Sequence, residues 1–120
     1  MKLPHQEPIR FVKELLEIDA EYAFVSCIFP HPPTLAMVCE AAAQSSAAFA
    51  QDDKNITMGF LVSLKDIELL NNLVYDNYII KIKREMVFGS MSEFRFELLN
   101  NSTIYATGNL VIALQDENSK

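Results

Sequence analysis

The feature that most constrains this chain is a long helical segment that carries almost no charge. Between residues 34 and 50 no glycine or proline interrupts the sequence, alanine fills seven positions, and Glu40 is the only charged residue. Pro33 and Thr34 are residue types that favour a helix start. A helix that is small or apolar nearly all round is usually buried. We therefore expect a long Ala-rich helix over residues 34–50, enclosed by the rest of the chain.

Beyond residue 54 apolar residues recur at every second position, which is the period of a half-buried strand. The alternating sets are Met58, Phe60 and Val62; Tyr78, Ile80 and Ile82; Phe94, Phe96 and Leu98; and Leu110, Ile112 and Leu114. Gly89-Ser90 and Asn100-Asn101 suit tight antiparallel hairpins, because glycine and asparagine tolerate a positive φ. Residues 9–18 and 21–29 are predicted as two earlier strands, although the apolar spacing of the first also fits a helix.

The order of two strands, one helix and about four further strands predicts an α+β domain with an antiparallel sheet. One curved sheet wrapped around a buried central helix is the hotdog architecture. With 120 residues and no linker-like segment, the chain fits a single hotdog domain over residues 1–120.

Composition excludes several classes of protein. The chain is 50% hydrophobic and 22% charged, unlike a disordered tail. No apolar run reaches the roughly 20 residues of a membrane span, and the start lacks a signal-peptide core, so we expect a cytoplasmic protein without membrane attachment. A net charge of −6 with scattered basic residues argues against nucleic-acid binding. Cys27, Cys39 and two histidines provide no ligand set for zinc, so no metal or cofactor is expected.

Five short segments, in order, resemble the hotdog-fold 3-hydroxyacyl-ACP (acyl carrier protein) dehydratases over nearly the whole chain. They are LPHQEPI at 3–9, EAAAQ at 40–44, the strand-turn-strand segment at 58–82, MVFGSMSEF at 86–94 and IYATGNL at 104–110. The resemblance implies an acyl thioester on ACP or CoA as the substrate. It also implies a homodimer or a higher homo-oligomer of dimers, and an unpaired sheet edge favours the same assembly.

The chain departs from the dehydratases of fatty-acid synthesis where they carry a catalytic histidine in the motif G-H-F-P-G. Here the segment is CIFPH at 27–31, so Ile28 stands at the position of that histidine, and the family's Pro-Gly-Val at the helix start is absent. In this respect the chain resembles more closely the divergent dehydratase-like proteins of aryl-polyene lipid biosynthesis (ApeP-like), which also lack that histidine.

Dehydration needs a base for the C2 proton and an acid for the leaving 3-hydroxyl. Glu40, which matches the family's helical glutamate, is the candidate acid; the alternative is an exposed glutamate or one bonded in a dimer seam. His31 lies nine residues before Glu40 and could act as the base, or it could be a plain surface residue. His5 matches the histidine of the opening motif and is either a third catalytic candidate or a structural histidine.

Substrate contacts are expected along the same helix. Gln44 follows Glu40 by four residues on one helix face, where it could orient Glu40 or bond a substrate oxygen. The N–H groups of Leu35 and Ala36, at the start of the helix, could meet the thioester oxygen.

Lys81 and Lys83 share one strand face, where they could bind the phosphate of phosphopantetheine or an acidic carrier protein. A solvated strand face is the alternative. The sequence therefore predicts a 3-hydroxyacyl-thioester dehydratase of a specialised lipid or polyketide-type pathway. Two rivals stay open: a catalytically inactive hotdog subunit that binds an acyl chain or partners a paralogue, and an acyl-CoA thioesterase with its carboxylate on the helix.

Overall fold

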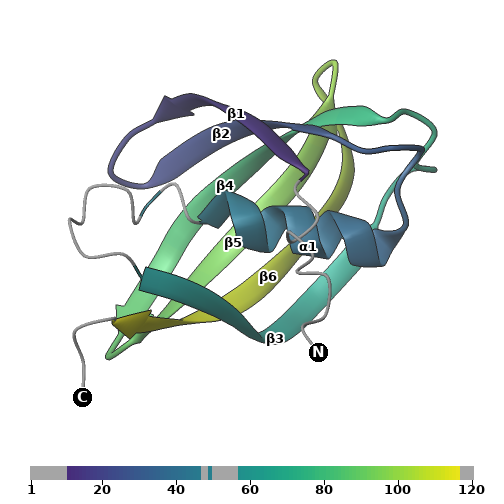
Figure 1. Ribbon diagram of the computed structural model, residues 1–120. Helices are drawn as coiled ribbons and strands as arrows, with labels where there is room; N and C mark the ends of the chain where they lie inside the picture. The colour runs from purple at the N-terminus through teal and green to yellow at the C-terminus, as the bar shows by residue number, and fades with distance from the viewer. Residues whose placement is uncertain (1–10, 47–48, 50–56, 117–120) are drawn as a thin grey trace, which may run out of the picture.

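The computed structural model describes residues 11–46, 49 and 57–116. These residues form six strands and one helix (Figure 1), in the order β1 (Val12–Ile18), β2 (Tyr22–Ile28), α1 (Leu35–Ser45), β3 (Thr57–Leu69), β4 (Asn77–Phe88), β5 (Met91–Asn100) and β6 (Thr103–Asp116). The strands make one antiparallel sheet in the order β1-β2-β4-β5-β6-β3. The predicted α+β arrangement is confirmed for this part of the chain, including the strand interpretation of β1.

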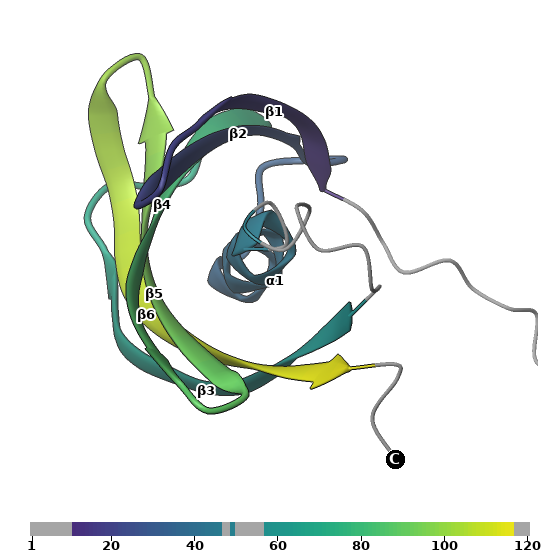
Figure 2. The same ribbon diagram turned by 90° about the vertical axis from the view of Figure 1, so that its left-hand side faces the viewer.

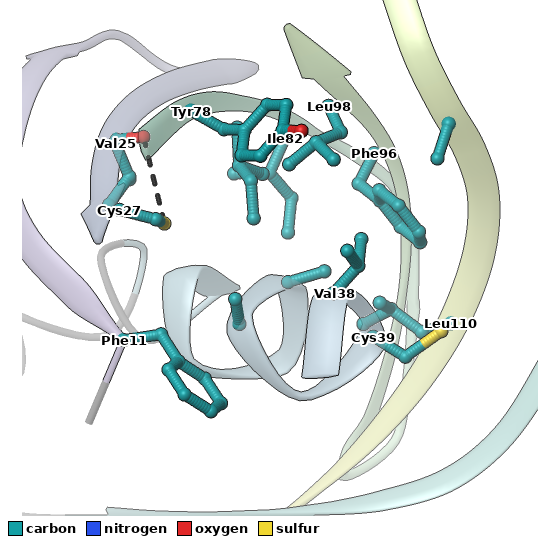
Figure 3. Packing of buried hydrophobic residues seen from close by; sticks show 14 of the residues in the cluster. Phe11, Val25, Cys27, Val38, Cys39, Tyr78, Ile82, Phe96, Leu98 and Leu110 are labelled. Atoms are coloured by element: carbon teal, nitrogen blue, oxygen red, sulfur yellow. Dashed lines mark hydrogen bonds between the residues drawn. The ribbon is translucent and has the colours of Figure 1, made fainter. Parts of the chain in front are cut away.

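The sheet curves around α1 (Figure 2), and the core fills the space between them. The helix contributes Val38, Ala41 and Ala42, each fully buried. Fully buried residues of the facing strands are Ala23 of β2, Ile80 and Ile82 of β4, Phe96 and Leu98 of β5, and Ala106 and Leu110 of β6. Figure 3 shows this packing from close by. Alanine side chains let the helix backbone approach the sheet closely, so the alanine-rich segment explains why one helix fits inside the curve.

The helix starts as predicted but is shorter than predicted. Thr34 is the N-cap, and its Oγ1 accepts the N–H of Met37 at 3.2 Å. The helix ends at Ser45 after 11 residues, not at residue 50. Ser45 and Ser46 donate their hydroxyls to the carbonyls of Ala41 and Ala43, which competes with regular helix continuation. Residues 47, 48 and 50 lie outside the described residues, and no described helix is long and apolar enough to cross a membrane.

The alternation of apolar residues is confirmed in β4, β5 and the described side chains of β6. In β3 the side chains of Met58 and Phe60 lie outside the described residues, and Val62 does not fit the alternation. Val62 is 53% exposed, because the pairing of β3 with β6 shifts register between Leu61 and Ser63. The Gly89-Ser90 turn is confirmed. The second turn was predicted one residue too early, since Asn101 and Ser102 are the residues with positive φ.

Both cysteines belong to the core. Cys27 is 1% exposed and Cys39 is 5% exposed. Burial raises the pKa of the Cys27 thiol to about 12, although a hydrogen bond with Ser45 acts in the opposite direction. Burial also raises the pKa of Cys39. Neither thiol has the low pKa of a nucleophile, so both are hydrophobic core residues.

Close packing explains why β6 has a glycine, Gly108, in its middle. A Cβ at this position would lie 2.8 Å from the ring of Phe96 and would also meet the side chain of Ile67. Because Phe96 is fully buried, its ring has no space to move into. We predict that Gly108→Ala lowers the free energy of unfolding by about 1–3 kcal/mol, measured by urea denaturation.

The matched control is Gly89→Asn. Gly89 has φ 63° with no atom near a built Cβ, and asparagine tolerates this conformation. Its effect should stay below about 1 kcal/mol. Equal effects of the two substitutions would contradict the packing described for Gly108.

Thiol labelling tests the burial of the cysteines. We predict that a disulfide reagent such as Ellman's reagent reacts with neither thiol in the folded protein and with both in denaturant. Ser90→Cys places a third thiol on an exposed turn and should add one fast-reacting group. Fast reaction of Cys27 or Cys39 in the folded wild type would mean that the core is open.

Candidate active site

Glu40 lies on the side of α1 that is turned away from the sheet. Its two neighbours in sequence, Cys39 and Ala41, are buried, whereas Glu40 is exposed in the single chain. It is the only charged side chain in Leu35–Ser45. The helix therefore presents one carboxylate on an otherwise uncharged surface, on the side that the chain's own strands do not cover.

Gln44 holds this carboxylate. Its Nε2 donates to Oε2 of Glu40 at 3.2 Å, across one turn of the helix. Its Oε1 accepts the backbone N–H of Phe11 at 2.9 Å and, more weakly, that of Val12 at 3.4 Å. Gln44 thus connects the start of β1 to Glu40. The sequence predicted the contact with Glu40 but not the contact with β1, which is 33 residues away along the chain.

His31 is exposed in the loop before α1. Its Nδ1 lies 2.9 Å from the carbonyl oxygen of Pro32. Because a carbonyl only accepts, Nδ1 must be the donor in this hydrogen bond, and Nε2 is the ring nitrogen left for other contacts. Within the described residues no hydrogen bond or ion pair joins His31 to Glu40. His5 lies outside the described residues.

The start of α1 offers backbone donors near this surface. The hydroxyl oxygen of Thr34 accepts a hydrogen bond from the N–H of Met37, and the carbonyl oxygen of Thr34 accepts one from the N–H of Val38 at 3.1 Å. The N–H groups of Leu35 and Ala36, the first two of the helix, have no acceptor within the helix. Leu35 is half-buried and Ala36 is exposed. These N–H groups can donate hydrogen bonds to an anion or to a polarised carbonyl oxygen.

The structure does not bring Lys81 and Lys83 together with Glu40. Tyr78, Ile80 and Ile82 face the helix, so the two lysines point to the outer face of the sheet. There the Lys81 ammonium lies 4.7 Å from the ring centre of Tyr22 and that of Lys83 lies 5.6 Å from it. A phosphate held by these lysines would be separated from Glu40 by the sheet.

Arg84 follows Lys83 but points the other way. Its guanidinium donates to the carbonyl of Phe49 at 3.2 Å and lies 4.7 Å from the centre of the Phe49 ring. The ring of Phe49 in turn stacks on Phe94. Arg84 therefore joins β4 to Phe49, beyond the end of α1, and has a structural role.

Sequence reasoning missed the exposed apolar side chains of β3 and of the loop that follows it. Leu61, Leu64 and Leu69 of β3 are 40–49% exposed, and Leu70 and Val74 beyond it are 50% and 60% exposed. The signal was present in the segment LVSL at residues 61–64, where apolar residues occupy both strand faces. Large exposed apolar areas mark interaction surfaces.

The outer face carries a separate groove of about 610 Å³. Its lining includes Leu16, Ile28, Tyr75 and Leu99. Ile28, the residue at the position of the family's histidine, is 46% exposed and alternates with the inward-facing Cys27. This groove therefore lies across the sheet from Glu40 and belongs to a different surface. The described residues contain no cluster that could hold a metal ion.

No protein-family model and no curated protein matches the sequence. Solved structures match in fold. The dehydratase heterocomplex ApeI:P from Xenorhabdus doucetiae matches with a TM-score of 0.80 and 12% identity, over 97% of this chain and 90% of that chain. A mutant thioesterase from Pseudomonas aeruginosa matches with a TM-score of 0.70 and 10% identity, over 88% of this chain and 81% of that chain.

A hot-dog-like protein from Thermanaerovibrio acidaminovorans gives a TM-score of 0.67 with 11% identity, over 81% of this chain and 82% of that chain. These identities are low, so the likeness concerns the path of the backbone and not the site residues. Together with the antiparallel sheet that curves around α1, it establishes that this chain has the hotdog fold.

Proposed function

We propose that the protein is an acyl-thioester enzyme of the 3-hydroxyacyl-ACP dehydratase type. The observation that carries the proposal is the carboxylate of Glu40, held by Gln44 at 3.2 Å on the open side of an otherwise uncharged helix. The backbone donors at the start of the same helix supply a place for the thioester oxygen. The fold likeness to a dehydratase heterocomplex supports this choice.

The proposed reaction removes water from a 3-hydroxyacyl thioester. A base takes a proton from C2, the electrons form the double bond between C2 and C3, and the 3-hydroxyl leaves as water after it accepts a proton. Glu40 is the proposed acid for the leaving hydroxyl. The proposed base is Nε2 of His31, with His5 as the other candidate. The acyl group would arrive on an acyl carrier protein or on CoA.

Assembly through β3 is part of the proposal, because a single chain leaves Glu40 exposed. The sheet has two edges. β1 is short, with charged residues and two register shifts that protect an edge from pairing. β3 has 13 residues and exposes Leu61, Val62 and Leu64. A second chain paired along β3 would extend the sheet and cover the apolar side chains next to α1.

Two observations favour rival functions. His31 makes no bond to Glu40 in the described chain, which favours a non-catalytic subunit that binds an acyl chain or needs a paralogue to complete its site. The fold likeness extends equally to thioesterases, and a helical carboxylate could activate water to hydrolyse a thioester.

Glu40→Gln tests the site and separates these functions. On purified protein with 3-hydroxyacyl-ACP and 3-hydroxyacyl-CoA, we expect the wild type to form the 2-enoyl thioester without releasing free thiol. The substitution should lower this rate by roughly 10²–10⁴, because it removes the acid. Glu17→Gln, an exposed glutamate on β1, is the matched control and should keep the wild-type rate.

Each rival predicts a different product. Free thiol in place of the enoyl product would identify a thioesterase. No product from the protein alone would support the non-catalytic subunit. Equal rates for Glu40→Gln and wild type would reject the assignment of Glu40.

The assembly has its own test. Light scattering at micromolar concentration should give at least twice the chain mass of 13.6 kDa for the wild type. Leu64→Glu places a charge on the exposed face of β3 and should give single chains. Leu16→Glu does the same on β1 and should leave the assembly intact, since Leu16 is similarly exposed at 47%. Single chains in the wild type, or loss of assembly only with Leu16→Glu, would contradict pairing through β3.

A further inference from the structure

Three contacts of the Gln44 side-chain amide, with Phe11, Val12 and Glu40, fit one orientation of the amide. Oε1 accepts two backbone N–H groups, those of Phe11 and Val12, and a backbone N–H can only donate. Rotating the amide by half a turn would place its NH₂ group against both donors. Gln44 is therefore obliged to present an N–H, and not its oxygen, to Glu40.

The anchor for this orientation is rigid. Phe11 is 5% exposed, and its ring lies 4.9 Å from that of Phe29, which is 1% exposed. The backbone of Phe11 also accepts the N–H of Ile28 at 2.9 Å. Core packing and the hydrogen bond with Ile28 thus hold the start of β1 in place. The hydrogen bonds of Gln44 then set the position of the Glu40 carboxylate relative to β1.

We propose that Gln44 is a positioning residue that fixes the carboxylate of Glu40, with Oε2 bonded to the amide and Oε1 left for the substrate. This inference rests on the proposed function, since that function gives Glu40 its reacting role. It adds that Glu40 accepts at Oε2 in the resting protein. Proton exchange with a substrate then takes place at Oε1, whose position is set by β1.

Two substitutions distinguish a positioning role of Gln44 from a purely structural one, in which Gln44 only connects α1 to β1. Gln44→Glu keeps an oxygen for the N–H groups of Phe11 and Val12, so the tie to β1 survives. It replaces the donor facing Glu40 with a second carboxylate oxygen, which repels. Gln44→Met removes both the hydrogen bonds to the start of β1 and the N–H donor that faces Glu40. A structural role predicts that the methionine variant suffers more, whereas positioning predicts that the glutamate variant already loses function.

The expected result for Gln44→Glu is a kcat about 10²-fold below wild type at neutral pH, with a smaller change in KM. The rate should recover relative to wild type as the pH falls. Once the two carboxyls share one proton, an O–H donor again faces Glu40. Asn100→Asp is the matched change of amide to acid. Nδ2 of Asn100 donates to the carbonyl of Asn77 at the outer groove, and the activity of the variant should follow wild type at every pH.

Other ionisable groups do not explain a rate of Gln44→Glu that recovers relative to wild type as the pH falls. On the inner face of the strands packed against α1, the described ionisable side chains are Cys27, Tyr78 and Arg84, and α1 itself carries Cys39. Burial raises the pKa of both thiols and of Tyr78, so they stay neutral in acid, and arginine stays charged. His31 makes no hydrogen bond or ion pair with Glu40 or Gln44 within the described residues, and it is present in every variant.

On the two strands that flank α1, Glu68 of β3 pairs with Thr107, which also pairs with the outward-facing Glu97, and Asp66 lies in a register shift with φ 55°. The remaining charged groups point to the outer face. Lys13 and Glu14 of β1 line the outer groove, and Glu17 pairs in register with the outward-facing Phe24. Lys65 of β3 makes its ion pair with Glu93 on the outer face. These groups are common to all the variants.

Unfolding supplies a second readout that needs no activity. The carboxyl pair created by Gln44→Glu has a raised pKa in the folded state, so the folded variant binds more protons than the unfolded chain. Its free energy of unfolding relative to wild type should therefore be highest in acid and fall as the pH rises through that pKa. Gln44→Met should show a loss that does not change with pH.

The outcomes are distinct. A wild type that turns over neither thioester overturns the proposed function, and the unfolding comparison then still decides whether Gln44 faces Glu40 as described. Gln44→Glu with wild-type kcat and pH profile, or with a pH-independent loss equal to that of Gln44→Met, overturns the positioning role of Gln44.

Discussion

The close contact between the small-residue side of α1 and the inner face of the sheet determines most of what this molecule can do. Ala41, Ala42 and Val38 are fully buried against strands whose inner residues are large and apolar. A helix with bulkier residues at these positions would be pushed out of the curve. Register shifts in the pairings of β1 with β2, β3 with β6, β4 with β5 and β5 with β6 allow the sheet to bend around the helix.

This packing decides which side chains remain for function. Once one side of α1 is committed to the core, its other side must face outward, and Glu40 is the charged residue found there. Gln44 lies at the border between the two sides, so it reaches both the backbone of β1 and the carboxylate of Glu40. The apolar side chains of β3 are exposed in the single chain, and in the proposed assembly a second chain would cover them.

Local patterns predicted what depends on local chemistry. The alternation in β4 and β5, the capping by Thr34 and the turn at Gly89 follow from residue type and spacing alone. The end of α1 depends on how two serine hydroxyls bond to carbonyls behind them, which composition does not reveal. The same alternation that identified β4 also places Arg84 on the opposite face from Lys81 and Lys83.

The sequence singled out Glu40 and Gln44 as candidates, but it did not give the geometry around them. Glu40 and Gln44 stand out because charge and amide are rare on this helix. The contact of Gln44 with Phe11 joins segments that are far apart in the chain, and it depends on how β1 crosses the helix. The exposure of Glu40 likewise depends on what the single chain leaves uncovered, which no local pattern encodes.

A crystal structure of the protein with a 3-hydroxyacyl-pantetheine amide, in which a stable amide replaces the thioester, tests the central claim most directly. The account predicts that the acyl head binds between α1 and β3 of an assembled protein, with its 3-hydroxyl within hydrogen-bond distance of Glu40 Oε1 and its carbonyl oxygen at the N–H groups of Leu35 or Ala36. Binding of the analogue in the outer groove, with Glu40 left facing solvent in the assembled protein, would contradict it.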